Sequence, residues 1–461
     1  MGGTSDTIVA AATPPGRGGV AIVRVSGTMA PAIAQTLLGS LPAPREATFG
    51  RWRDAAGEII DSGIAIFFPA PGSFTGEDVL ELQGHAGLIV EALIERVVEL
   101  GARRARPGEF SERAFLNDKI DLAQAEAIAD LIDAGSRGAA RAAMRSLQGE
   151  FSARVQATRA ALTQLRVYVE AAIDFPEEEI DFLASTELAE RVAYVRELLG
   201  EVLQAARRGA LLTRGLTVVI AGRPNAGKST LMNQLVGFDA AIVTPVPGTT
   251  RDPLRATLEI NGVPVELIDT AGLREQGGAN EHDAIEAEGI RRAREAIARA
   301  DHVLYVIDAA EDPDAYSFAE ECDTLPEGVV VTLVMNKSDI AVVDTAPGGG
   351  NAADASAMDS PRIAISAATG AGLDALRARL ASVAGHAEAA GGTFSARARH
   401  VEALERAAQQ MDAACRQLAA KQGELAAFEL RGAQASLGEV LGDVTSDELL
   451  GHIFRSFCIG K

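Results

Sequence analysis

A glycine-rich stretch is the part of the sequence best suited to chemistry: residues 222–230 read Gly-Arg-Pro-Asn-Ala-Gly-Lys-Ser-Thr. The apolar run before it, residues 216–221, predicts a buried strand, and residues 231–236 predict a helix after it. This order is the phosphate-binding P-loop pattern. Gly222 and Gly227 allow successive N–H groups to turn toward a phosphate, Lys228 neutralises its charge, and the Ser229 hydroxyl can bind Mg²⁺.

Two further motifs fit the γ-phosphate end of a nucleotide. Thr250, in the loop before the next strand, can bind Mg²⁺ from the side opposite Ser229 and so sense the γ-phosphate. Asp269, at a strand end, can hold a metal-bound water, and the Gly272 N–H can reach the γ-phosphate.

Two more motifs fit the base. Residues 336–339 read Asn-Lys-Ser-Asp, and the carboxylate of Asp339 matches the two donors on a guanine edge, which adenine lacks. The Ser366-Ala367 pair offers a backbone donor to the guanine oxygen. Five motifs in this order predict GTP binding. The predicted GTP-binding residues are Asn225, Ala226, Gly227, Lys228, Ser229, Thr230, Thr244, Pro245, Val246, Pro247, Gly248, Thr249, Thr250, Asp269, Thr270, Ala271, Gly272, Asn336, Lys337, Asp339, Ser366 and Ala367.

The hydrolytic machinery departs from the Ras type. Leu273 stands where Ras-type enzymes carry the glutamine that orients the attacking water. Arg251 and Arg274 are candidate arginine fingers, although surface arginines in such loops are more often solvated. Asn225 offers an amide oxygen that can hold a monovalent cation in place of a finger, and an asparagine that merely shapes the turn explains it equally well.

Composition limits the possible classes of protein. A length of 461 residues favours about three domains, and a net charge of −21 argues against an extended basic surface for nucleic acid. Three cysteines make no disulfide framework and fit a reducing compartment, so we expect a cytoplasmic protein. Neither a signal peptide nor an 18-residue apolar run is found, so no membrane association is expected. The C-terminal Cys458-Ile-Gly-Lys is a poor prenylation signal.

The texture of the chain divides it into four segments. Residues 1–119 are expected to be α+β, with residues 106–119 forming a structural corner, and residues 120–214 to form two or three long helices. Residues 215–382 form the α/β G domain, and helices return in residues 383–461. The simplest architecture is a multidomain protein with the G domain inserted into one helical domain; two independent helical domains are the alternative. The acidic run 174–181 suits a solvated helix start better than a metal site.

The whole chain resembles the MnmE (TrmE) tRNA-modification GTPases, a potassium-activated group. The motifs that carry this resemblance are residues 6–8, 12–19, 74–79, 106–119, 121–122, 124–126 and the terminal Phe-Cys-Ile-Gly-Lys at 457–461. The resemblance implies an N-terminal tetrahydrofolate-binding and dimerisation domain, a helical domain and an inserted Ras-like G domain. It also implies a homodimer that joins the FAD- and NADH-dependent partner MnmG in a heterotetramer.

Together, such proteins add a carboxymethylaminomethyl or aminomethyl group to carbon 5 of the wobble uridine of certain tRNAs. The one-carbon unit comes from 5,10-methylene- or 5-formyltetrahydrofolate, and K⁺-dependent G-domain dimerisation drives GTP hydrolysis. By matching position, the folate contacts are Arg24, Glu81, Lys119 and Lys461, and the K⁺ ligands are Asn225, Thr244, Val246 and Thr249.

The resemblance also implies a catalytic acid, Glu286, which would orient water in place of the missing glutamine; Glu288 is nearby, so this choice depends on register. Cys458 matches a family cysteine of undecided role. The main alternative function is a GTP-dependent switch or ribosome-assembly factor without modification activity. A non-enzymatic scaffold with a decayed nucleotide site is disfavoured by the five intact motifs.

Overall fold

The computed structural model describes residues 6–174, 186–238, 255–269, 296–298, 300–322, 325, 329–341, 360–384, 394–443, 447–455, 457 and 460. The chain divides into two compact units. The first comprises residues 1–129, 146–200 and 402–461, and the second comprises residues 130–145 and 201–401. Within the described residues, none of the helices combines the length and the apolar character that crossing a membrane requires.

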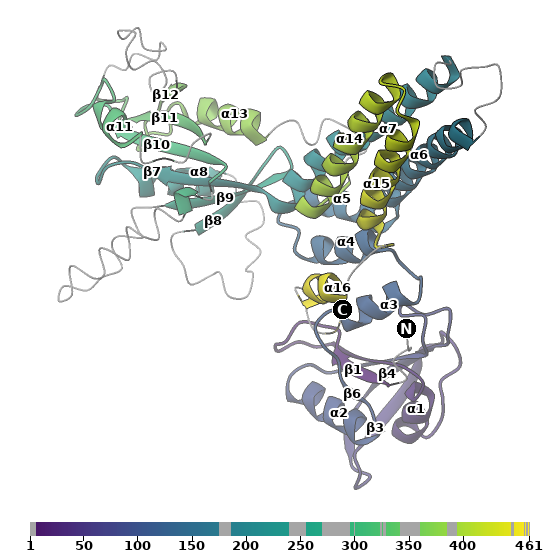
Figure 1. The fold of residues 1–461 in the computed structure, drawn as a ribbon. Helices are drawn as coiled ribbons and strands as arrows, with labels where there is room; N and C mark the ends of the chain where they lie inside the picture. The colour runs from purple at the N-terminus through teal and green to yellow at the C-terminus, as the bar shows by residue number, and fades with distance from the viewer. Residues whose placement is uncertain are drawn as a thin grey trace. The chain divides into compact units, whose positions relative to one another are not determined.

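A six-stranded sheet forms the N-terminal part of the first unit, in the order β3-β4-β5-β2-β1-β6 (Figure 1). All neighbours are antiparallel except β1 and β6. Alternate residues of β2 and β5, such as Val23 and Leu82, are buried against α1 and α2, because side chains along a strand point to opposite faces. The bounds are β1 Ile8–Ala11, β2 Ala21–Ser26, α1 Ala30–Leu38, β3 Thr48–Arg53, β4 Ile59–Phe68, β5 Val79–Gly84, α2 Leu88–Glu99 and β6 Arg103–Arg104.

A short helix, α3 (Glu109–Leu116), lies where the sequence predicted only a structural corner. The prediction missed it because charged residues occupy its buried side and hide the apolar period. Glu109 is 1% exposed and Arg113 is 3% exposed, and the two are ion-paired 3.2 Å apart. Strands β3 and β6 were also not predicted, since β3 is mostly exposed and β6 has two residues.

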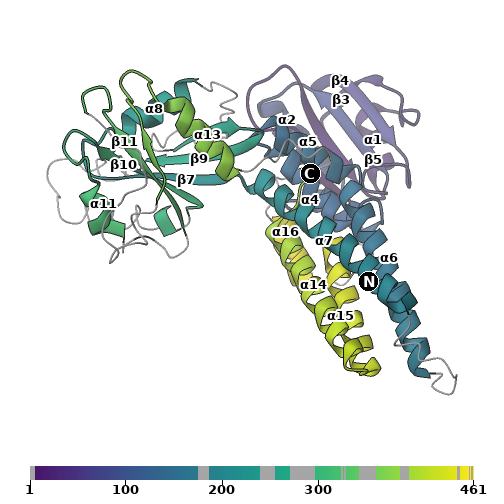
Figure 2. The same ribbon diagram turned by 90° about the horizontal axis from the view of Figure 1, so that it is seen from above.

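Four long helices of the helical region run side by side: α6, α7, α14 and α15 (Figures 1 and 2). Helix α6 precedes the G domain in the chain and α15 follows it, yet the two pack closely, which confirms the predicted insertion. Both helices carry fully buried leucines, among them Leu162 and Leu165 of α6 and Leu430 and Leu437 of α15. The bounds are α4 Leu122–Ile132, α5 Arg137–Leu147, α6 Glu150–Asp174, α7 Thr186–Arg214, α14 Ala398–Ala419, α15 Gly423–Leu441 and α16 Asp447–Arg455.

The G domain contains a second six-stranded sheet, in the order β12-β11-β10-β7-β9-β8, parallel except for β8. Helices α8 and α13 share one apolar cluster with this sheet, whereas α11 contributes Phe318 to a second cluster. This is the predicted Ras-like α/β arrangement. The bounds are β7 Leu216–Ala221, α8 Lys228–Phe238, β8 Arg255–Ile260, β9 Val263–Asp269, β10 His302–Asp308, α11 Tyr316–Glu321, β11 Val330–Asn336, β12 Arg362–Ala364 and α13 Leu373–Ala384.

The β8–β9 hairpin turns at Asn261-Gly262, as predicted from that dipeptide, with φ of 50° and 80°. The tip of the hairpin docks on the start of α5. The Ser136 hydroxyl donates to the Gly262 carbonyl oxygen at 2.5 Å, and a Cβ added at Gly138 would lie only 2.5 Å from the same oxygen. Because β9 ends at Asp269, this contact joins a strand of the predicted phosphate site to a helix outside the G-domain sheet.

Candidate functional site

The predicted nucleotide-binding motifs meet at one edge of the G-domain sheet. The P-loop follows β7, Asp269 ends β9, Asn336 ends β11, and Ser366 lies two residues beyond β12. These strands are parallel, so their carboxyl ends lie at the same edge, which is where ligands bind in open α/β sheets. The structure therefore brings together the described members of four motifs.

The P-loop depends on backbone conformations that suit glycine. Gly222 has φ of 132°, and a Cβ there would lie 2.2 Å from the carbonyl oxygen of Val306. Gly227 has φ of 95°, and a Cβ there would lie 2.2 Å from the side-chain nitrogen of Asn336. Asn225 has φ of 64°, a left-handed conformation that asparagine tolerates better than most residues. This conformation supports the interpretation that Asn225 shapes the turn. Its side-chain amide still belongs to the phosphate-binding loop and so remains a candidate cation ligand.

The charged and hydroxyl groups of the loop are already fixed. Lys228 is 5% exposed and donates to the carbonyl oxygens of Gly222 and Arg223 at 2.8 and 2.7 Å. The Ser229 hydroxyl donates to Asp269 Oδ2 at 2.7 Å. The two residues predicted to bind Mg²⁺ directly and through water therefore lie within hydrogen-bond distance of each other. Hydroxyl and carboxylate oxygens are the ligands that this hard cation prefers.

Asn336 connects three loops of this edge. Its Nδ2 donates to the Ala226 carbonyl oxygen at 2.8 Å, and its Oδ1 accepts from the Ala367 N–H at 2.9 Å. Asn336 is 3% exposed, so these bonds are shielded from water. The P-loop and the last loop of the site are held together by one side chain.

The next residues of this loop are those predicted to recognise the base. Lys337 has φ of 64°, and its ammonium group lies 2.5 Å from Asp308 Oδ2. The hydrogen bond to Asp308 raises the pKa of Lys337 above its ordinary value, so the side chain stays charged. Asp339 is exposed, with its carboxylate available for a ligand. This fits recognition of a base that presents two donors.

The predicted folate residues Arg24 and Glu81 form a cross-strand ion pair in the N-terminal domain. They are partners in the β2–β5 register, and Arg24 Nε donates to Glu81 Oε1 at 2.9 Å. The Arg24 guanidinium lies 5.7 Å from the ring centroids of both Phe74 and Phe110. A charged pair bordered by two aromatic rings can bind a flat heterocycle through both stacking and hydrogen bonds.

Lys119 contacts the loop at residues 71–76. Its ammonium group donates to the Pro71 carbonyl oxygen at 2.9 Å, and a Cβ added at Gly76 would lie 3.4 Å from its side chain. The same loop carries Phe74, which stacks near Arg24. The described members of the predicted folate set thus border one loop.

Several predicted site residues lie outside the described residues: Thr244, Pro245, Val246, Pro247, Gly248, Thr249, Thr250, Thr270, Ala271, Gly272, Glu286, Cys458 and Lys461. The candidate fingers Arg251 and Arg274, Leu273, and the acidic run beyond Asp174 lie there as well. Among the residues that the structure does describe, no cluster of three or more His, Cys, Asp or Glu side chains is arranged to hold a metal.

Comparison with protein families covers nearly the full chain. The model of the GTP-binding protein TrmE N-terminus matches residues 7–119, and the model of the MnmE helical domain matches residues 122–458. The chain belongs to the MnmE family. It is 54% identical to the tRNA modification GTPase MnmE of Chromohalobacter salexigens, covering 99% of this chain and 98% of the relative. The MnmE proteins of Nitrosococcus oceani and Pseudomonas aeruginosa are 52% and 53% identical, covering 99% and 100% of this chain and 97% and 100% of those proteins.

Sequence reasoning missed two features that bear on the site. One is the role of Asn336 as a clasp, since the motif named it only as part of base recognition. The other is Asp308, which ends β10 and orients Lys337. A carboxylate at the end of a buried strand between two motif-bearing strands was the available signal for Asp308.

Proposed function

We propose that this chain is an enzyme that hydrolyses GTP and uses the resulting conformational cycle to modify the wobble uridine of certain tRNAs. The observation that carries the proposal is the meeting of the P-loop, Asp269, Asn336 and Ser366 at one sheet edge in a chain related over its full length to tRNA modification GTPases. The proposal places the protein in the cytoplasm, where tRNA and GTP are present.

Two cations belong to the proposed hydrolysis. Ser229 and Thr250 would hold Mg²⁺, and Asn225, Thr244, Val246 and Thr249 would hold K⁺. The described members fit: Ser229 and Asp269 present adjacent oxygens, and Asn225 carries its amide on the phosphate loop. Bound cations offset the negative charge that develops on the phosphate oxygens. Lys228 adds a positive charge fixed by Gly222 and Arg223, and Glu286 would orient the attacking water.

The modification step needs a carbon donor and a partner. We propose that Arg24, Glu81, Lys119 and Lys461 bind 5,10-methylene- or 5-formyltetrahydrofolate. The paired Arg24 and Glu81 beside two phenylalanine rings support this assignment. The product would carry a carboxymethylaminomethyl or aminomethyl group at carbon 5. The working assembly would be a homodimer combined with the FAD- and NADH-dependent MnmG into a heterotetramer.

A GTP-dependent switch without modification activity is the alternative, and the G domain alone fits both functions. The N-terminal domain favours modification, because a switch needs neither the Arg24–Glu81 pair nor its aromatic neighbours. The full-length relatives named as tRNA modification GTPases favour it as well.

The deciding experiment is the nucleoside profile of tRNA from cells that lack this protein. We expect the modified wobble uridine to disappear and to return with the wild-type gene but not with Lys228→Ala. An unchanged profile would contradict the modification function. In vitro, replacing K⁺ by Na⁺ should slow GTP hydrolysis substantially, and Glu286→Ala should lower kcat while GTP affinity stays unchanged. Equal rates of GTP hydrolysis in K⁺ and Na⁺ would contradict the proposal that Asn225 binds K⁺.

A further inference from the structure

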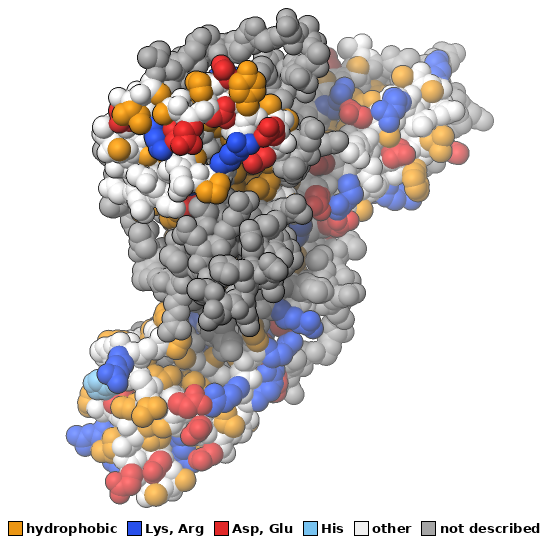
Figure 3. Space-filling view, turned by 90° about the vertical axis from the view of Figure 1, so that its left-hand side faces the viewer, with side chains coloured by type: hydrophobic (Ala, Val, Ile, Leu, Met, Phe, Trp, Pro, Cys, Tyr) orange, Lys and Arg blue, Asp and Glu red, His pale blue; other side chains and the backbone are white. Residues whose placement is uncertain are grey.

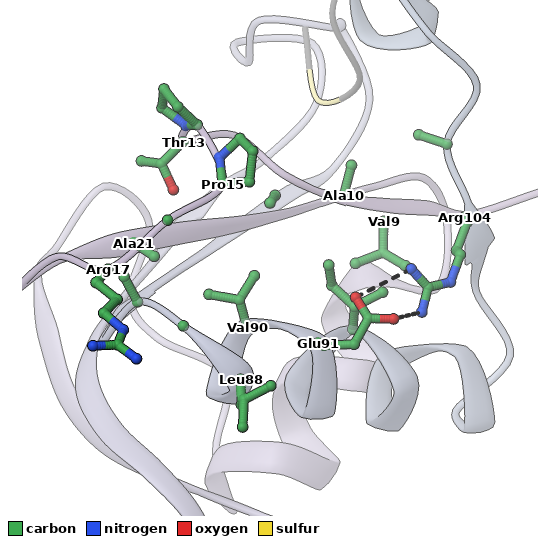
Figure 4. Close-up of a pocket in the computed structure, with 17 residues that line it drawn as sticks. Val9, Ala10, Thr13, Pro15, Arg17, Ala21, Leu88, Val90, Glu91 and Arg104 are labelled. Carbon is green, nitrogen blue, oxygen red and sulfur yellow. Dashed lines mark hydrogen bonds and ion pairs between the residues drawn. The ribbon is translucent and has the colours of Figure 1, made fainter. Parts of the chain in front are cut away.

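The N-terminal domain contains a cavity of about 830 Å³ at the edge of its sheet, where β1 ends and α2 begins (Figure 4). Its walls come from the end of β1, the loop at residues 13–17, and the first turns of α2. Apolar side chains predominate, among them Val9, Ala10, Val90 and Ile94. The volume and the apolar walls are those of a ligand-binding cleft. The loop at 13–17 belongs to a motif that the proposed function leaves unused.

This cavity is separate from the Arg24–Glu81 pair. Val9 packs in the apolar cluster under α2, whereas Ala10 packs in the cluster of Phe110, beside which Arg24 lies. The cavity therefore opens on the α2 side of the sheet and the ion pair on the α3 side. The two sites share Ala10: this residue of β1 lines the cavity, and it is paired with Arg24 of β2 in the sheet. Adjacent strands lie about 5 Å apart, so the cavity and the Arg24 site are neighbours on opposite sides of the same part of the sheet.

Cations border the apolar walls. In Figure 4, Arg17 stands at one end of the cavity and Arg104 at the other, with Val90 between them. Of these two arginines, Arg104 has 54% of its side chain exposed and is ion-paired with Glu91, which also lines the cavity. Figure 3 shows that Lys and Arg side chains alternate with Asp and Glu side chains on the drawn face of the N-terminal domain, so any positive charge toward a ligand is local to the cavity. A guanidinium group at each end of the cavity favours a ligand that carries negative charge at its two ends.

A ligand with an apolar body and negative charge at each end would match these walls and the two arginines. A nucleotide within an RNA chain has this form, because its base can stack on apolar walls while a phosphate lies on each side of its sugar. Enzymes that modify a base take it out of the stack into such a pocket. A free folate carries its carboxylates at one end and would leave one of the two cationic ends unused.

We propose that this cavity receives one nucleotide of the tRNA anticodon loop, with its phosphates toward Arg17 and Arg104. This inference rests on the proposed function. It adds that the substrate base binds in this cavity, next to the Arg24 site. Glu91 opposes binding, because its carboxylate accepts hydrogen bonds from both terminal nitrogens of Arg104. A phosphate at that end must share the guanidinium with Glu91.

Leu88 offers a clean test because it lines the cavity and is 91% exposed, so a charge there leaves the fold intact. In the complete assembly with the FAD-dependent partner, Leu88→Lys should bind an anticodon stem-loop RNA several-fold more tightly than wild type, and Leu88→Glu several-fold more weakly. Arg17→Ala should weaken binding and lower the slope of log affinity against log salt by about one. Glu91→Gln should strengthen binding. GTP hydrolysis without RNA should stay the same in all four.

Arg53→Ala is the matched control, since Arg53 is an exposed arginine of β3 that donates to Gly57 and lies on the opposite edge of the sheet. Its RNA affinity should equal that of wild type. Loss of RNA binding in Arg53→Ala equal to that in Arg17→Ala would show diffuse electrostatics and overturn the inference. Equal RNA affinities for the two Leu88 variants would overturn it as well.

A 4-thiouridine at the wobble position supplies an independent readout by photo-crosslinking. We expect the crosslink on residues 13–17 or 88–91, and a crosslink elsewhere on this chain or only on the partner would overturn the inference. Weaker binding of a reduced folate, but not RNA, in Arg17→Ala and Leu88→Glu would assign the cavity to folate instead. If the wild-type assembly neither binds nor modifies tRNA, the proposed function fails, which differs from failure of the variants alone.

Discussion

Asn336 donates a hydrogen bond from its side-chain amide to the carbonyl oxygen of Ala226, 2.8 Å away. This bond joins the loop expected to recognise guanine to the loop expected to hold the phosphates. The other end of the same amide accepts from Ala367 at 2.9 Å. The two ends of the nucleotide site are thus held in register by contacts within the protein itself, which reduces the ordering that GTP must impose on binding.

Asn336→Ala should therefore lower the affinity for both GTP and GDP. It leaves the Ala226 carbonyl and the Ala367 N–H without their partner in a buried setting, and two such losses are worth about 2–3 kcal/mol. That corresponds to a loss of affinity of about 30- to 150-fold, measurable by titration with a fluorescent guanine nucleotide. Asn117→Ala, which removes a comparable amide-to-carbonyl bond to Thr75 in the N-terminal domain, is the control. Equal nucleotide affinities for the two variants would refute the clasp.

Base specificity should depend on Asp339. Asp339→Asn replaces one acceptor of the carboxylate by a donor, so preference should move from guanine toward xanthine nucleotides. Competition between GTP and XTP for the same site measures this directly. Asp374→Asn, at a fully exposed position on α13, should leave the preference unchanged. A variant at Asp339 that keeps the wild-type preference for GTP would show that another group reads the base.

Much of the G domain was predictable from sequence, because its motifs sit at strand ends whose apolar runs are continuous. The turn at Asn261-Gly262 followed from local conformational preference alone. The insertion of this domain followed from helical texture on both sides of it.

Other features depend on contacts between distant residues, which spacing does not reveal. The buried face of α3 carries ion pairs between Arg113 and the carboxylates of Glu109, Glu77 and Asp6. The sequence of α3 therefore lacks the periodic apolar residues that predict a helix. The cavity beside β1 and α2 lies where the pairing of β6 with β1 ends, and a two-residue strand leaves almost no signal in sequence. The ion pair between Arg24 and Glu81 could not be predicted from spacing, because it depends on the register in which β2 and β5 pair.

The docking of the β8–β9 hairpin on α5 should be sensitive to a single methyl group. In Gly138→Ala the new Cβ would approach the Gly262 carbonyl oxygen to 2.5 Å, so the hairpin or α5 must move. We expect the G domain to lose about 1–3 kcal/mol of stability, as is typical of overpacking. Hydrogen exchange in residues 255–269 should increase, and tRNA modification per GTP hydrolysed should fall.

Gly200→Ala is the matched control, because Gly200 lies within α7 and a Cβ there meets nothing within 4 Å. Alanine is favoured over glycine inside a helix by about 1 kcal/mol, so this variant should be as stable as wild type or more so. If Gly138→Ala behaved like Gly200→Ala in both exchange and modification, the hairpin contact would have no coupling role.

The acid stability of the N-terminal domain should depend on Glu109. Burial raises the pKa of Glu109, but hydrogen bonds from Arg103, the Arg106 N–H and Arg113 outweigh it and lower the pKa from 4.5 to about 2. A carboxyl whose pKa is lower in the folded state stabilises that state fully above pH 4.5, and this contribution is lost as the pH falls toward 2. Its size is about 3 kcal/mol.

Trp52 makes this measurable, since it is the single tryptophan of the chain and is buried in the N-terminal domain. Denaturant titrations followed by its fluorescence should show the free energy of unfolding falling from pH 4.5 to pH 2 in wild type. Glu109→Gln should be less stable at pH 7, and its curve should be flatter and meet that of wild type near pH 2. Glu112→Gln, which removes a carboxylate paired with Arg106 on the more exposed side of α3, should keep the wild-type slope. A wild-type slope in Glu109→Gln would place the acid-sensitive group elsewhere in this ionic cluster.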